Sequence, residues 1–79
     1  MYELEYTNSF KKNYKRIQKR GYDIELLTAL FEQLAMYANV DALYKPHKLG
    51  GKYAKYWECH IKPDWLLIWE VNELFIHIV

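Results

Sequence analysis

Residues 53–61, Tyr-Ala-Lys-Tyr-Trp-Glu-Cys-His-Ile, decide the fold that we predict for this chain. Apolar and polar side chains alternate along the stretch, which is the period of a β-strand with one buried face. One face carries Trp57, Cys59 and Ile61, and the other carries Tyr56, Glu58 and His60. We expect the first face to pack against helices and the second to lie open to solvent. Glu58 and His60 would then belong to a site on an open sheet face.

Two apolar segments follow this strand. Residues 66–71 and 74–79 are rich in β-branched and aromatic side chains, which favour strands. Residues 62–64, Lys-Pro-Asp, predict the first turn because Pro fixes its own backbone and Asp bonds to its neighbours. Residues 72–73, Asn-Glu, predict the second turn. The C-terminal part is therefore expected to form a three-stranded antiparallel meander.

The N-terminal part predicts one strand and a short helix. Residues 2–6 alternate apolar and charged, as a half-buried strand does. Residues 7–9, Thr-Asn-Ser, offer several N-caps for a helix with Phe10, Tyr14 and Ile17 on its apolar face. Gly21 can end this helix because a left-handed conformation costs glycine no steric penalty.

A second helix and a loop complete the pattern. Asp23 can cap a helix with a wide apolar stripe over residues 24–38. The periodicity is lost over residues 39–51, where Pro and Gly predict a loop. The order β-α-α-β-β-β indicates an α+β fold, an antiparallel sheet with two helices on one face. A chain of 79 residues has room for one hydrophobic core, so we expect residues 1–79 to form a single domain.

Composition limits the class of protein. The chain is 52% hydrophobic and 18% aromatic, which is typical of a folded domain and not of a disordered segment. A single cysteine, Cys59, excludes an internal disulfide and fits a reducing compartment. No apolar run is long enough to span a bilayer, and the N-terminus with Glu3 and Glu5 does not resemble a signal peptide. We therefore expect a cytoplasmic protein with no membrane contact.

The charges are unevenly distributed although the net charge is only +1. Two segments are basic: the first contains Lys11, Lys12, Lys15, Arg16, Lys19 and Arg20, and the second contains Lys45, Lys48, Lys52, Lys55 and Lys62. The first is interpreted as a solvated helix face. The second basic segment surrounds two histidines, and Tyr and Trp residues lie between its lysines. Lysines can bind the phosphates of single-stranded nucleic acid, and aromatic rings can stack on its bases. Lys48, Lys52, Lys55, Lys62 and Trp65 are the predicted substrate-binding residues.

The candidate catalytic residues are His47, His60 and Asp64. Two imidazoles beside a carboxylate suit acid–base chemistry near neutral pH. RNA carries its own nucleophile, the 2′-hydroxyl, so a base and an acid are enough to cut it without a metal. No HExxH or CxxC pattern is present, and neither a metal nor another cofactor is predicted. From the residues alone, a structural role for the histidine pair stays open.

Two motifs resemble the YafQ branch of the RelE/ParE toxin superfamily. They are residues 44–51, Tyr-Lys-Pro-His-Lys-Leu-Gly-Gly, and residues 59–68, Cys-His-Ile-Lys-Pro-Asp-Trp-Leu-Leu-Ile. The resemblance implies a type II toxin that acts as a ribosome-dependent mRNA endonuclease and is silenced by a DinJ-like antitoxin. It implies acid–base roles for His47 and His60, an acidic site residue in Asp64, and an aromatic pocket position in Trp65. A homo-oligomer is not required.

The chain also departs from the family pattern. Trp57 stands where the family usually has a basic residue, and the family's R-x-G-[ST]-H segment, with its catalytic His and phosphate-binding Arg, has no counterpart before Val79. His77 lies too early to replace either. The alternative is therefore a toxin-like binding module that engages an antitoxin or a ribosomal surface without chemistry. The ParE branch, which poisons gyrase, does not share the paired histidines.

We predict weak or absent mRNA cleavage by this 79-residue chain. The loss of an acid–base group and of a phosphate clamp would each typically lower the rate by ~10²-fold or more. Primer extension on mRNA bound to ribosomes measures this directly. Robust cleavage by the pure chain would contradict the prediction.

Overall fold

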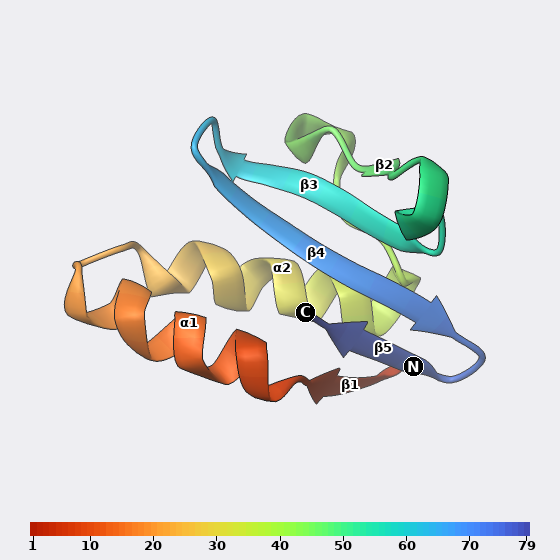
Figure 1. The fold of residues 1–79 in the computed structure, drawn as a ribbon. Coiled ribbons are helices and arrows are strands. Elements are labelled where there is room, and N and C mark those ends of the chain that lie inside the picture. The colour runs from red at the N-terminus through yellow and green to blue at the C-terminus, as the bar shows by residue number, and fades with distance from the viewer.

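A five-stranded sheet carries two helices on one face (Figure 1). The computed structural model describes all residues, 1–79. The regular elements are β1 (Glu3–Tyr6), α1 (Asn8–Lys19), α2 (Ile24–Tyr37), β2 (His47–Lys48), β3 (Tyr56–Lys62), β4 (Trp65–Asn72) and β5 (Phe75–Ile78). Two short 3₁₀ turns, η1 (Ala42–Tyr44) and η2 (Gly51–Tyr53), flank β2. The predicted α+β fold and its element order are confirmed.

The helices begin and end where local chemistry allows. The Phe10 N–H donates to the Thr7 hydroxyl at 3.0 Å, and the Glu25 N–H donates to the Asp23 carboxylate at 3.2 Å. Both interactions satisfy an N–H that the first turn of a helix leaves without a partner. Gly21, just after α1, has a φ of +78°, the left-handed conformation predicted for it. Thr7 and Asp23 are therefore N-caps, as predicted.

The hydrophobic core lies between the helices and the inner face of the sheet. The strand pair β3–β4 places Cys59 opposite Leu67 and Trp57 opposite Trp69. The fully buried side chains come from α2 and the three central strands: Leu27, Leu30, Leu34, Cys59, Trp69, Ile76 and Ile78. Every buried residue is hydrophobic. The alternation in residues 53–61 thus correctly divides β3 into an inner apolar face and an outer polar face.

Two features of the sheet differ from the prediction. The segment 39–51, predicted as a loop, contains η1 and the short strand β2, which pairs antiparallel with β3. A strand of two residues is too short to show a period of two. In addition, β1 pairs in parallel with β5, so the sheet is only mostly antiparallel. The pattern of residues 2–6 indicates which face is buried but contains no information about the partner strand.

The observed boundaries of β3 and of the turn between β4 and β5 also differ from the predicted ones by one to three residues. β3 begins at Tyr56 because residues 51–53 form η2, and the turn between β4 and β5 lies at residues 73–74 instead of 72–73. Neither α1 nor α2 is long and apolar enough to cross a membrane.

Cys59 provides a test of this packing. Its side chain is fully buried in β3, and burial, with a smaller contribution from the charge of Glu58, raises the pKa of the thiol from 9.0 to about 11. Folding therefore favours the neutral thiol. This stabilisation is complete below the pKa of the unfolded chain and is lost as the pH rises through about 11.

We predict that iodoacetamide labels Cys59 much more slowly in the folded chain than in guanidinium chloride at pH 7.5, because only an accessible thiolate reacts. Mass spectrometry at timed intervals measures the two rates. Equal rates would show that β3 does not bury this side chain.

Candidate active site on the open sheet face

The short strand β2 brings His47 next to His60. It pairs with β3 so that His47 lies opposite Glu58, and His60 follows Glu58 by two residues on the same face. The two imidazole rings are stacked with an angle of 26° between their planes, and their centroids are 6.1 Å apart. The structure therefore joins two predicted site residues that are 13 positions apart in the sequence.

Both ring nitrogens of His47 face an acceptor. Nε2 lies 3.3 Å from Glu58 Oε1, and Nδ1 lies 3.0 Å from the carbonyl oxygen of Lys45. A carboxylate and a carbonyl can only accept, so both contacts are satisfied when both nitrogens carry protons, in the imidazolium form. Lys45 has a left-handed φ of +52°, as do Ala38 at the end of α2 and Glu73 in the turn between β4 and β5.

Glu58 was predicted to lie on the open sheet face but was not assigned a catalytic or binding role. Its side chain is only 17% exposed, whereas that of His47 is 47% exposed, so the carboxylate is the more shielded partner of the pair. The sequence placed Glu58 on the open face but contained no indication that His47 would lie opposite it. That contact depends on β2, which was not predicted.

A cavity of about 620 Å³ opens beside His60. Its lining combines cationic, aromatic and apolar residues: Leu26, Leu43, Tyr44, Lys45, His60, Ile61, Lys62 and Pro63. Lys45 and Lys62 bring two positive charges to the same hollow as the imidazole. This composition suits a ligand that has both an anionic group and a flat apolar part.

Asp64 and Trp65 lie apart from the histidine pair. Asp64 is exposed in the turn between β3 and β4, and its side chain forms no ion pair or hydrogen bond within the chain. Trp65 belongs to the hydrophobic core, where its ring meets that of Tyr22 edge to face with 5.0 Å between the centroids. The burial of Trp65 favours packing over the predicted role in stacking on substrate.

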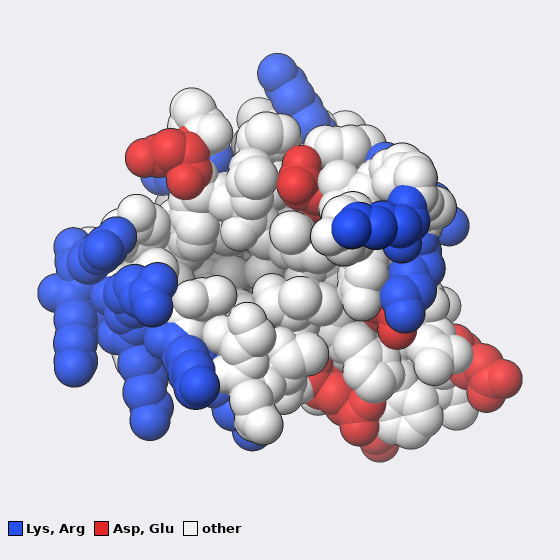
Figure 2. Space-filling view, viewed as in Figure 1, with Lys and Arg blue, Asp and Glu red and all other residues white.

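The predicted substrate-binding lysines differ in their surroundings. Lys62 lines the cavity, and Lys48 is exposed on β2 next to His47. Lys52 lies over the ring of Tyr53 at 5.2 Å. Lys55 lies 3.4 Å from Glu70, and its hydrogen bond to that carboxylate raises the pKa of the lysine. Figure 2 shows basic side chains over β2 and η2 on the right of the molecule, separate from those of α1 on the left.

The third histidine is not part of the site. His77 lies on β5, and its Nε2 is 3.2 Å from Glu5 Oε1 on the neighbouring strand β1. No group of three or more His, Cys, Asp or Glu side chains in the chain could hold a metal ion.

The comparisons with known proteins agree with this fold. Residues 2–79 match the model of the family described as the bacterial toxin YafQ of type II toxin–antitoxin systems. The mRNA interferase toxin YafQ of Escherichia coli K12 is 33% identical over 72 residues, which cover 90% of this chain and 78% of that protein.

Two solved structures are also closely similar. The E. coli DinJ–YafQ complex contains a chain that superposes with a TM-score of 0.88 at 30% identity, covering 99% of this chain and 88% of that one. A metal-bound toxin from Helicobacter pylori gives a TM-score of 0.90 at 33% identity, covering 100% and 90%. The expected resemblance is confirmed, and this chain belongs to the YafQ toxin family of type II toxin–antitoxin systems.

Proposed function

We propose that this chain is a slow, ribosome-dependent mRNA endonuclease in which His60 and His47 act as base and acid. The observation that carries the proposal is the stacked histidine pair beside a cationic cavity. The E. coli relative is named an mRNA interferase, which supports the choice of RNA as substrate.

The reaction needs no group beyond the RNA and the two imidazoles. His60 removes the proton of a 2′-hydroxyl, and the 2′-oxygen attacks the adjacent phosphorus. The bond from phosphorus to the 5′-oxygen breaks as His47 turns its Nε2–H from Glu58 toward that oxygen and donates the proton. The products are a 2′,3′-cyclic phosphate and a free 5′-hydroxyl, and proton exchange with water restores both imidazoles.

The geometry supports a different catalytic role for each histidine. A catalytic group must come within about 2.6–3.2 Å of the atom that it serves, so two rings 6.1 Å apart can reach opposite sides of one phosphodiester. His47 is assigned as the acid because both of its ring nitrogens face hydrogen-bond acceptors, an arrangement that only N–H groups complete. His60 is assigned as the base because it lines the cavity and has no carboxylate partner.

The cavity residues would position the RNA. Lys45 and Lys62 can bind phosphate oxygens, and the ring of Tyr44 can stack on a base. Lys52 would extend the positive surface toward the rest of the RNA strand, whereas Lys48 pairs with Trp57 on the face of β2 opposite to His47. Asp64 would act at the rim of this surface because it is exposed in the turn that follows Lys62.

A DinJ-like antitoxin and the ribosome are the proposed partners. The related E. coli toxin has been solved in a complex with DinJ, which supports the first of them. The exposed lysines near the site suit the ribosome, since ribosomal RNA is a dense array of phosphates.

We expect His60→Gln to abolish mRNA cleavage, because Gln cannot accept the 2′-hydroxyl proton. The measurement is primer extension on programmed ribosomes, with the chain in excess so that slow cleavage remains visible. His77→Gln is the matched control, because it changes the same residue type on the same sheet. His77 pairs with Glu5 and does not line the cavity. The His77→Gln variant should cleave mRNA at the rate of the unmodified chain.

Either of two results would contradict the endonuclease proposal. Cuts that persist in His60→Gln would show that this imidazole is not the base. A complete absence of cuts from the unmodified chain, together with retained ribosome binding in a sedimentation assay, would favour the non-catalytic binding module.

We predict that Glu58→Gln lowers the cleavage rate by about tenfold to a hundredfold, which corresponds to the loss of one hydrogen bond between charged groups. Glu58→Asp should recover part of the rate. Glu3→Gln, an exposed position on β1, controls for the change in net charge, and an equal loss in that variant would rule out a specific role for Glu58.

A further inference from the structure

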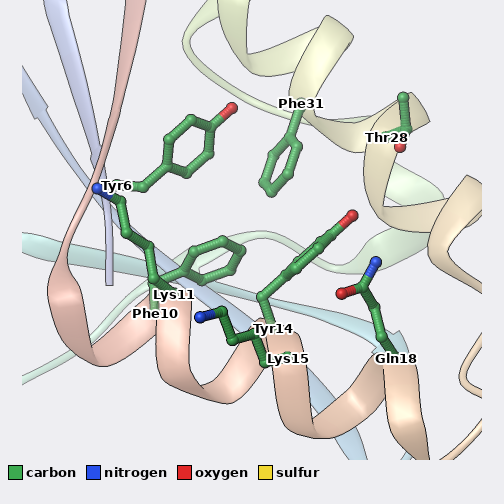
Figure 3. Close-up of a pocket in the computed structure, with 8 residues that line it drawn as sticks. All are labelled: Tyr6, Phe10, Lys11, Tyr14, Lys15, Gln18, Thr28 and Phe31. Atoms are coloured by element: carbon green, nitrogen blue, oxygen red, sulfur yellow. The ribbon is translucent and has the colours of Figure 1, made fainter.

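An aromatic cleft opens between α1 and α2, away from the histidine pair (Figure 3). Its volume is about 550 Å³, and its lining consists of Tyr6, Phe10, Lys11, Tyr14, Lys15, Gln18, Thr28 and Phe31. These residues belong to α1, α2 and the end of β1, so the cleft lies in the helical layer. The histidine pair of the proposed reaction lies on the opposite face of the sheet.

The aromatic rings of the cleft hold one another in place. The ring centroids are 5.5 Å apart for Tyr6 and Phe10, 5.4 Å for Tyr6 and Phe31, and 5.8 Å for Phe10 and Phe31. Tyr14 extends the cluster through Phe10, at 5.9 Å. Figure 3 shows the rings converging from three elements on one hollow. The cleft is therefore formed before any ligand binds, which lowers the entropy lost on binding.

Positive charge surrounds this apolar hollow. Lys11 and Lys15 line it, and the basic residues Lys12, Arg16, Lys19 and Arg20 continue along α1. None of the six forms an ion pair within the chain. Figure 2 shows them as a dense group of basic side chains on the left of the molecule. An apolar pocket with unpaired cations at its rim is complementary to a ligand that is apolar at one point and acidic around it.

We propose that the cleft binds an acidic segment of a partner protein, which places one aromatic or large aliphatic side chain between α1 and α2. Its carboxylates would pair with Lys11 and Lys15, and the apolar side chain would displace water from the rings of Phe10 and Phe31. This proposal does not depend on RNA cleavage.

A peptide fits the cleft better than RNA does. Nucleic acid bases bind to exposed flat ring faces. Here Phe10 contacts three other rings, and Tyr6 and Phe31 contact two each, so these faces are largely occupied by one another. The open hollow of about 550 Å³ has room for a short stretch of peptide.

The test is a selection from a displayed library of random twelve-residue peptides on the folded 79-residue chain, followed by fluorescence polarisation on the enriched peptides. We expect the enriched peptides to be acidic and to share an aromatic or large aliphatic residue. Lys11→Glu with Lys15→Glu should weaken their binding by at least about tenfold, as should Thr28→Trp, which fills the cleft from its rim.

Matched controls separate the cleft from its general surroundings. Lys12→Glu with Lys19→Glu makes the same change in charge on α1, and Ala29→Trp adds the same ring at an exposed neighbour of Thr28, but these positions do not line the cleft. Both controls should change the affinity less than about twofold. Circular dichroism verifies that each variant is folded.

Several results would overturn the proposal. One is a selection that enriches no peptide, or only neutral and basic ones. Another is an equal loss of affinity in Lys12→Glu with Lys19→Glu, which would indicate long-range attraction alone. A third is binding of a single-stranded twelve-nucleotide RNA that Thr28→Trp abolishes while peptide binding is unchanged, which would assign the cleft to nucleic acid.

Discussion

The pairing register of β3 and β4 is the constraint on which the rest of the structure depends. Cys59 opposite Leu67 and Trp57 opposite Trp69 direct one set of side chains toward the helices. A shift by one residue would exchange the two faces, because successive side chains of a strand point in opposite directions. Glu58 and His60 would then be buried among apolar residues, and the core would lose Cys59 and Ile61. One register thus fixes both the core and the position of the proposed base.

The two faces of the sheet have different roles: the inner face forms the core, and the outer face carries the charged residues. The inner face has only apolar buried residues, so the core contains no ionisable group except the Cys59 thiol. The outer face has three histidine or lysine contacts with carboxylates, in the pairs His47–Glu58, Lys55–Glu70 and His77–Glu5. Because stability comes from one side, substitutions on the other can alter charge and reactivity without removing core contacts. This separation suits a small chain, in which the loss of a few core contacts would be enough to unfold it.

The structural features that depend on local chemistry and on periodicity could be predicted from the sequence. Thr7, Asp23 and Gly21 could be identified because capping needs only particular side chains near a helix end. His47 and His60 could be identified from their chemistry and from the resemblance to known toxins. The contact of His47 with Glu58 could not, because it depends on a two-residue strand and on the left-handed turn at Lys45. The position of Trp65 in the core and the aromatic cleft also required the packing of elements distant in sequence.

The shortness of β2 has a consequence for how the proposed catalyst is assembled. His60 belongs to a long strand with neighbours on both sides, whereas His47 is on a two-residue edge strand between two 3₁₀ turns. Short edge segments with exposed hydrogen bonds open at a much smaller free-energy cost than the global unfolding of a domain. The proposed base therefore lies on a strand that also carries core residues, and the proposed acid lies on a short edge segment whose opening would leave the core intact. The activity of such an enzyme would be set by a local folding equilibrium of a few residues.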